Sequence, residues 1–362
     1  MKKQDILLKL IAVCGEMPVD MRAMAVGSIS YATSLVTRLK KEGYITVRKK
    51  DGLKGYVLKV KGRQYLLEKY WNDVEYFLMG NIKTNHVRSD LDKRVRLQRM
   101  GMVWVFFYYL DIQIFRELKP AIFTNDNEKV ILVGNGRKSI YYGSLEFQAG
   151  LDKIRGSRAC GILLSEETNY VVYNTMEQHM KWAKKTERSM RSWLEGKMMC
   201  WGMRSEVEAI ILGNNMEFLP ELLESDGGIH KNLFRVDDVY EKYYYVPICS
   251  EAIIQMNLLK SKKIKYALHH FLSEMLQTVE EREYILASGY DKYGDTVYFC
   301  YESELRYLAR VKQELGWRQS GKIICMDYQK CAFQKYFGET VKIQVLITEK
   351  VLDYMKSLDR NE

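Results

Sequence analysis

The residues of this chain best suited to catalysis lie in the segment Ser144-Leu-Glu146-Phe-Gln148, which follows a predicted strand. Metal-dependent nucleases carry an acid-x-Lys pair at a strand end and a second acid earlier in the chain, for which Asp126 is the candidate. On a strand, Glu146 and residue 148 point to one face, where a carboxylate can hold Mg²⁺ and a cation can stabilise the attacked phosphate. Gln148 stands at the cation position and is uncharged. Three interpretations follow: an active nuclease, a degenerate nuclease-like scaffold, or an unrelated α/β domain. We expect no cleavage activity.

The spacing of histidine, cysteine and glycine favours no other catalytic or metal site. The five histidines include one close pair, His269-His270, and adjacent side chains point apart on a helix. The two-histidine metal site of a relaxase is therefore not predicted. The chain has neither the HxxR spacing of a tyrosine recombinase nor a GxxxxGK[ST] phosphate loop. Its seven scattered cysteines form no CxxC pair. We expect no catalytic residue, metal or cofactor, and enzyme activity is the less favoured class.

Positive charge is concentrated in one short segment. Residues 38–63 carry ten Lys and Arg against two acids, which accounts for most of the net charge of +10 of the whole chain. The sequence pI is near 9.0. Clustered cations of this kind are the electrostatic signature of a nucleic-acid-binding protein.

Residues 28–63 have the pattern of a recognition helix followed by a β-hairpin. On a helical wheel centred on Ser34, hydroxyl and cationic side chains share one face. The opposite face is apolar and consists of Ala32, Leu35, Val36 and Leu39, extended by Ile29. Gly43 is the expected helix stop after two lysines. The turn signal Asp51-Gly52 then separates two expected strands, Tyr44–Lys50 and Gly55–Val60.

We expect two sets of residues in this segment to contact duplex DNA. The side chains facing the bases of the major groove would be Ser30, Tyr31, Ser34, Thr37 and Arg38. The cations lying on phosphates and in the groove beside the wing would be Lys40, Lys41, Arg48, Lys49, Lys50 and Lys54. Arginine is suited to base contact because it bonds guanine bidentately, whereas phosphate contacts set register. Two alternatives remain for the wing: a charged edge that resists strand addition, or a surface that binds protein.

The flanking sequence completes a winged helix-turn-helix over residues 1–80. A first helix is expected to end at Gly15, Pro18 suits the first turn of a second helix, and Gly62–Phe77 is expected to form a further helix. The polar stretch Gly80–Asn85 is the predicted boundary. Residues 81–119 would form a helical connector whose basic start, capped by Ser89, is either a solvated helix end or a second DNA contact.

From residue 120 strands and helices alternate, which predicts an α/β domain over 120–278 and an α/β subdomain over 279–362. The expected strands are Val130–Val133, Ser139–Tyr142, Gly161–Leu164, Tyr170–Tyr173, Ala209–Leu212, Leu233–Val236, Tyr284–Ala287, Val297–Tyr301, Lys322–Met326 and Val341–Ile347. The expected helices are Met176–Leu194, Met216–Glu224, Glu251–Leu276, Glu302–Leu315 and a final one to Leu358. The predicted fold class is mixed α/β.

Composition is that of a globular protein and not of a membrane or secreted one. Hydrophobic residues make up 47% and charged residues 28% of the 362 residues. The longest apolar run, Met102–Leu110, is about half of what a membrane span needs, and Asp5 and Lys9 interrupt the N-terminal apolar run, so no signal peptide is expected. Scattered unpaired cysteines are typical of a reduced compartment. We expect a cytoplasmic protein without a membrane role.

The motifs LKKEGYI and VLKVKGRQYL, with the basic wing between them, resemble the winged-helix domain of the replication-relaxation family of bacterial plasmids and integrative conjugative elements. YYGSLEF, EAIILGNNMEF and residues 156–187 are similar to uncharacterised mobile-element proteins. The resemblance implies a DNA-binding protein that acts in replication, mobilisation or transcriptional control of an element. Its partners would be double-stranded DNA, a relaxase or replication protein, and a second copy in a homodimer. Two alternatives stay open: a metal-dependent nuclease, and a ligand-responsive transcription regulator.

Overall fold

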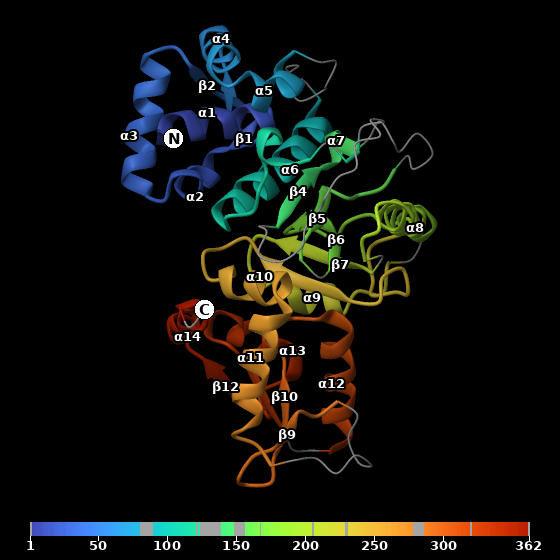
Figure 1. Cartoon of the computed structure of the whole chain (residues 1–362). Coiled ribbons are helices and arrows are strands. Elements are labelled where there is room, and N and C mark those ends of the chain that lie inside the picture. Colours follow the sequence, from blue (N-terminus) through green and yellow to red (C-terminus); the bar gives the residue numbers. More distant parts are fainter. Residues whose placement is uncertain are drawn as a thin grey trace. The chain divides into compact units, whose positions relative to one another are not determined.

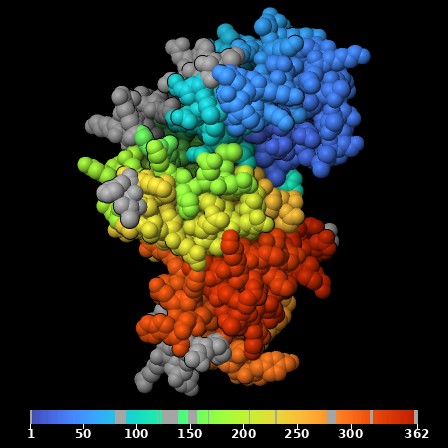
Figure 2. Space-filling model, turned by 180° about the vertical axis from the view of Figure 1, so that it is seen from behind, coloured from blue at the N-terminus to red at the C-terminus, as the bar shows by residue number. Residues whose placement is uncertain are grey.

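The computed structural model describes residues 2–79, 90–120, 122–123, 139–147, 156–166, 168–204, 206–228, 231–277, 286–318 and 321–360. The chain has a mixed α/β fold, as predicted (Figure 1). It divides into two compact units. Unit 1 is Met1–Arg155 with Ala159–Leu164, and unit 2 is Gly156–Arg158 with Ser165–Glu362. In Figure 2 the blue and cyan atoms belong to unit 1, and the yellow to red atoms belong to unit 2.

Unit 1 begins with three helices and a β-hairpin. These elements are α1 (Lys3–Cys14), β1 (Met17–Pro18), η1 (Val19–Met21), α2 (Arg22–Val26), α3 (Ile29–Lys41), β2 (Ile45–Lys50) and β3 (Leu53–Leu58). The three strands form an antiparallel sheet in the order β1-β3-β2. Pro18 lies on β1 opposite Gly55 and not in the first turn of a helix, so that prediction is wrong. An edge strand tolerates proline, because the missing N–H needs no partner there.

Two helices follow the hairpin where one was predicted over Gly62–Phe77. They are α4 (Val60–Lys69) and α5 (Trp71–Leu78), separated at Tyr70 with φ −136° and ψ 44°. The side chain of Asp5, buried on α1, accepts hydrogen bonds from the hydroxyls of Tyr65 and Tyr70, each at 2.7 Å. Asp5 thereby binds α4, through Tyr65, and the break itself, through Tyr70, to α1.

Helix α6 (Leu91–Tyr109) packs into the core of unit 1. At Gly101 an added Cβ would lie 3.3 Å from Cys14, so α6 and α1 approach closely there. The ring of Trp104 packs edge-on against Phe77 at 5.9 Å and Tyr141 at 5.1 Å between centroids. The helix of the predicted connector thus packs directly against α1 and α5.

The N-terminal end of α6 is capped by Asp90, whose side chain accepts from the backbone N–H groups of Asp92 and Lys93. The predicted boundary at Gly80–Asn85 and the predicted cap Ser89 lie outside the described residues. The capping residue of α6 is thus Asp90, one residue after the predicted position.

The rest of unit 1 contains η2 (Arg116–Leu118), β4 (Ile140–Gly143), α7 (Ser144–Phe147) and β5 (Gly161–Leu164). Strands β4 and β5 are antiparallel, with Tyr142 opposite Ile162. Gly143 is required by its neighbour: an added Cβ would lie 2.5 Å from the ring of Trp104. The segment around Glu146 forms a single helical turn and not a strand, so the predicted strand geometry of this acid is wrong.

Unit 2 contains a parallel sheet with the strand order β6-β7-β8. Its elements are β6 (Asn169–Met176), α8 (Lys184–Cys200), β7 (Val207–Gly213), α9 (Leu219–Leu223) and β8 (Tyr243–Pro247). All residues of β7 and β8 are buried, as expected of parallel strands.

The C-terminal part of unit 2 forms a second sheet, with β10, β11 and β12 parallel and β9 antiparallel to β10. Its elements are α10 (Ile253–Lys260), α11 (Lys262–Ser273), β9 (Gly289–Tyr290), β10 (Thr296–Phe299), α12 (Leu305–Arg318), β11 (Lys322–Met326), η4 (Asp327–Gln329), α13 (Lys330–Phe337), β12 (Lys342–Leu346) and α14 (Thr348–Arg360). Apolar residues of α10, α11 and α14 form one buried cluster with β10 and β11, including Leu258, Leu268 and Met355.

Several predicted boundaries in unit 2 are wrong. Leu233–Val236 is no strand: within it, Leu233 forms an isolated bridge with Lys181. Met176 ends a strand with φ 57°, and the helix predicted to begin there begins at Lys184. The helix predicted over Glu251–Leu276 is interrupted at Ser261, whose side chain caps α11. Val130–Val133 and residues 284–285 lie outside the described residues.

Within the described residues, no helix combines the length and apolarity that a membrane crossing requires.

Candidate nucleic-acid interface

Helix α3 divides into a buried and an exposed face, as its sequence pattern predicts. Ser28 caps its N-terminus by accepting a hydrogen bond from the backbone N–H of Tyr31 at 3.4 Å. The buried residues are Ala32, Leu35, Val36 and Leu39. Ile29 was expected to extend this face, but 68% of it is exposed, so that prediction is wrong. The side chain lies in the first turn of α3, before the helix meets the core.

Every α3 residue predicted to contact DNA is solvent-exposed. These residues are Ser30, Tyr31, Ser34, Thr37, Arg38, Lys40 and Lys41. Arg38 already has partners within unit 1. Its Nη2 donates to Gln4 Oε1 at 3.1 Å, and its Nε lies 3.9 Å from Glu42 Oε1. The guanidinium is thereby oriented beside the exposed face of α3.

Sequence reasoning missed Thr33 on this helix. The residue is exposed, and it lies one turn after Ile29 and one turn before Thr37. Its Oγ1 donates to the carbonyl oxygen of Ile29, and Thr37 Oγ1 donates to that of Thr33, each at 2.9 Å. On the helical wheel Thr33 lies about 100° from Ser34, outside the face to which the predicted DNA contacts were assigned.

The wing is the hairpin of β2 and β3, closed by Asp51 and Gly52. Both have positive φ, 52° and 75°, as a two-residue turn of type I′ requires. Lys49 stands directly opposite Lys54 in the hairpin register. These two lysines and Lys50 are exposed. The wing tip therefore concentrates three cations around one turn.

Arg48 is the wing cation that the structure places inward. Its side chain is 17% exposed, and its Nη1 lies 3.7 Å from Oε2 of the buried Glu16. Arg48 was predicted to contact phosphate. Its ion pair with Glu16 shows that it also stabilises the hairpin from within unit 1.

The support of the wing centres on Glu16 and on Arg94 of α6, which is fully buried. Arg94 Nη2 donates to Glu16 Oε1 at 2.6 Å, and Nε donates to Oε2 at 3.0 Å. Its Nη1 donates to the backbone oxygen of Lys50 at 2.8 Å. Gln98 Nε2 donates to Glu16 Oε1 at 2.8 Å. The hydrogen bonds that Arg94 donates to Glu16 raise the pKa of Arg94.

Arg94 belongs to the basic start of the predicted connector, which was expected to be either solvated or in contact with DNA, and its burial contradicts both alternatives for this residue. Glu16 and Arg94 are 78 residues apart in the sequence, so no local pattern could have paired them. They join α6 to the base and the tip of the wing.

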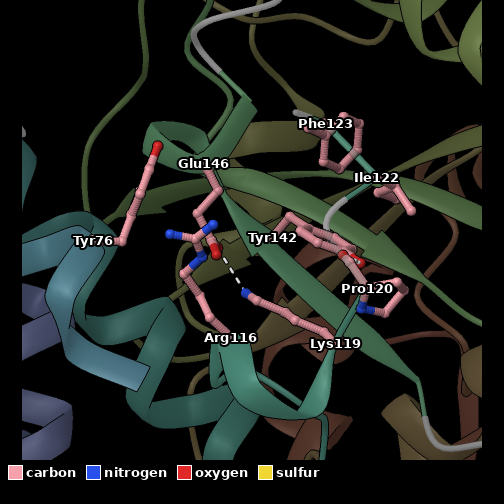
Figure 3. Close-up of a pocket in the computed structure, with 8 residues that line it drawn as sticks. All are labelled: Tyr76, Arg116, Lys119, Pro120, Ile122, Phe123, Tyr142 and Glu146. Carbon is pink, nitrogen blue, oxygen red and sulfur yellow. Dashed lines mark hydrogen bonds and ion pairs between the residues drawn. The ribbon is translucent and has the colours of Figure 1, made fainter. Parts of the chain in front are cut away.

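The acid of the nuclease hypothesis lies in a separate pocket of unit 1 (Figure 3). Glu146 Oε2 accepts from Lys119 Nζ at 2.7 Å and from the backbone N–H of Gly143 at 2.9 Å. Lys119 is the cation beside this acid, a role the sequence pattern assigned to position 148. Burial lowers the pKa of Lys119 to about 8. Its Nζ also donates to the backbone oxygen of Tyr141 at 2.8 Å.

Among the described residues that line this pocket, Glu146 is the one acidic, histidine or cysteine side chain. The cavity is about 50 Å³ and is lined by Tyr76, Arg116, Lys119, Pro120, Ile122, Phe123, Tyr142 and Glu146. Among the described residues, no three His, Cys, Asp or Glu side chains gather closely enough to hold a metal ion. Asp126 and Gln148 lie outside the described residues. Oε2 of Glu146 accepts from both Lys119 and a backbone amide, an arrangement typical of a structural ion pair.

Comparison with protein-family models, with curated proteins and with solved structures finds no match to this chain.

Proposed function

We propose that this chain is a DNA-binding protein and that unit 1 is a winged helix-turn-helix domain. Helix α3 would enter the major groove and present its hydroxyl groups and Arg38 to base edges. The wing would lie on the phosphate backbone through Lys49, Lys50 and Lys54. A helix placed in the major groove beside a basic element that follows the backbone is the usual division between base contact and positioning.

The observation that carries this proposal is the pair Lys49 and Lys54, opposite each other across the hairpin. Like charges directly opposite in an antiparallel pair are destabilising, and Lys50 adds a third cation at the same tip. Folding alone gains nothing from this arrangement. A polyanion seated on the tip would relieve the repulsion and gain affinity from it.

We further propose that the protein acts in the cytoplasm, in replication, mobilisation or transcriptional control of a mobile genetic element. This part rests on the resemblance of residues 39–66 and of segments in the middle of the chain to proteins of such elements. A homodimer would pair two winged helices on half-sites one helical turn apart, and unit 2 would supply the surface for the second copy, a relaxase or a replication protein.

The test measures the affinity of the full-length protein for duplex DNA as a function of salt. We compare the wild type with Lys49→Ala plus Lys50→Ala. Each phosphate contact contributes about 0.9 to the slope of log K against log salt, so the double variant should flatten that slope by about 2. The matched control is Lys262→Ala plus Lys263→Ala, which removes two exposed adjacent lysines from unit 2.

The control should leave the slope unchanged although it removes the same charge. Equal flattening by both variants would indicate non-specific attraction to a basic protein. A folded wild type without salt-dependent DNA affinity at low ionic strength would refute the proposal and leave the wing as a protein-binding surface.

A further inference from the structure

One stripe of the exposed face of α3, formed by Ile29, Thr33 and Thr37 at a spacing of four residues, offers no free hydrogen-bond donor. Thr33 and Thr37 each use the hydroxyl proton on a carbonyl of the preceding turn, at 2.9 Å. Each side chain therefore offers a methyl group and an acceptor oxygen, and no donor. This property follows from the contacts and is not visible in the composition of the helix.

Apolar surface borders these threonines. Ile29 is 68% exposed and precedes Thr33 by one turn, and Tyr31 is 45% exposed near the same helix end. Ser30, Ser34 and Arg38 lie beside this stripe, and Arg38 donates to Gln4 at 3.1 Å. Lys41 lies one turn after Thr37, at the C-terminal end of the stripe. The stripe of Ile29, Thr33 and Thr37 is thus made of apolar surface, methyl groups and hydroxyl oxygens.

We propose that this part of α3 recognises A·T base pairs through the 5-methyl group of thymine. The inference rests on the proposed function and specifies which base pairs the same helix selects. In the major groove an A·T pair presents the thymine methyl and the adenine N6 donor. A threonine whose proton is engaged is complementary to both, through its Cγ2 and its Oγ1.

A G·C pair is a poorer match for these two residues. Guanine presents two acceptors, O6 and N7, and neither Thr33 nor Thr37 has a hydroxyl proton left to donate to them. Cytosine presents an N4 donor but no methyl group, so the Cγ2 atoms of both threonines would lack an apolar partner. Charge complementarity with the wing cations favours DNA as the occupant of this face over an apolar protein partner.

The test uses the full-length protein and duplexes first selected from a random-sequence library. In the selected site each thymine is replaced in turn by uracil, which removes the 5-methyl group and leaves base pairing intact. Burial of one methyl group favours binding about three- to fourfold. We expect a loss of this size at one or two thymines and none elsewhere.

Two variants assign the effect to Thr37. Thr37→Ser keeps the hydroxyl and removes the methyl, so it should abolish the difference between thymine and uracil. Thr37→Val keeps a methyl on the same branched side chain and should retain that difference. Both variants should leave the salt dependence of binding unchanged, because neither alters a charge.

The possible outcomes separate this inference from the proposed function. Salt-dependent binding with G·C-rich selected sites, or equal affinity for thymine and uracil duplexes, would overturn the inference and leave DNA binding intact. A thymine preference that persists in Thr37→Ser and in Thr33→Ser would also overturn the assignment to these residues. Absence of any salt-dependent DNA affinity would overturn both proposals.

Discussion

Replacing Arg94 by methionine should destabilise unit 1 strongly, because it would leave Glu16 charged, buried and without its main partner. Glu16 is 2% exposed and Arg94 is fully buried. Removing one member of a buried ion pair typically costs about 3–5 kcal/mol. Gln98 would still donate to Glu16, and Arg48 would remain 3.7 Å away. We therefore expect the low end of that range, about 3 kcal/mol of unfolding free energy.

The measurement is urea unfolding of the full-length protein, with native-state hydrogen exchange to assign the loss to α1, α6 and the wing. The control is Lys93→Met, the neighbouring cation on α6. Its side chain is 63% exposed and pairs with Asp90 at 3.2 Å. Exposed pairs contribute at most about 1 kcal/mol, so this variant should be nearly neutral.

A second variant distinguishes a stranded charge from a simple loss of packing. Glu16→Gln in the Arg94→Met background removes the unpaired charge and keeps an acceptor for Gln98. It should recover part of the lost stability. A double variant as unstable as the sum of the single ones, or a cost below about 1 kcal/mol for Arg94→Met, the level of an exposed pair, would refute the ion-pair argument.

Three further predictions concern other parts of the chain. The pKa of Lys119 is lowered to about 8 in the folded protein, so between pH 8 and the ordinary pKa of lysine the unfolded state binds more protons than the folded state. The unfolding free energy measured with urea should therefore rise with pH in this range. Lys119→Met should lack this rise. Gly62→Ala should cost about 1–3 kcal/mol in the same assay, because an added Cβ would lie 2.3 Å from the backbone oxygen of Tyr44. Light scattering should give twice the chain mass of 42.6 kDa; the monomer mass throughout the micromolar range would contradict the homodimer.

Features that depend on local sequence were predictable. The buried face of α3 follows from helical periodicity, and the hairpin turn follows from Asp51-Gly52, because each is decided within a few residues. The exposure of Ile29 was not predicted. Helical periodicity shows on which face of α3 a residue lies, but not how far along the helix that face is covered by the core.

Features that depend on distant residues were not predictable. The break at Tyr70 is held by hydrogen bonds to Asp5, 65 residues earlier. Lys119 lies 27 residues before Glu146 and reaches it from η2's C-terminal end. The sequence offered Gln148 as the residue beside this acid, because a motif can compare only neighbouring positions.

Contacts between distant residues also decide how much of the chain the proposed DNA-binding domain needs. Residues 1–80 contain all the recognition-helix and wing residues predicted to contact DNA, yet Glu16 accepts hydrogen bonds from Arg94 and Gln98 on α6, at 2.6 and 2.8 Å. Arg94 also fixes the backbone of Lys50 at the wing tip. A fragment ending at residue 80 would keep the cations and lose the group that orders them. Because binding an unordered hairpin adds the entropic cost of ordering it, such a fragment should bind DNA more weakly than the full chain, even where it retains the same charge.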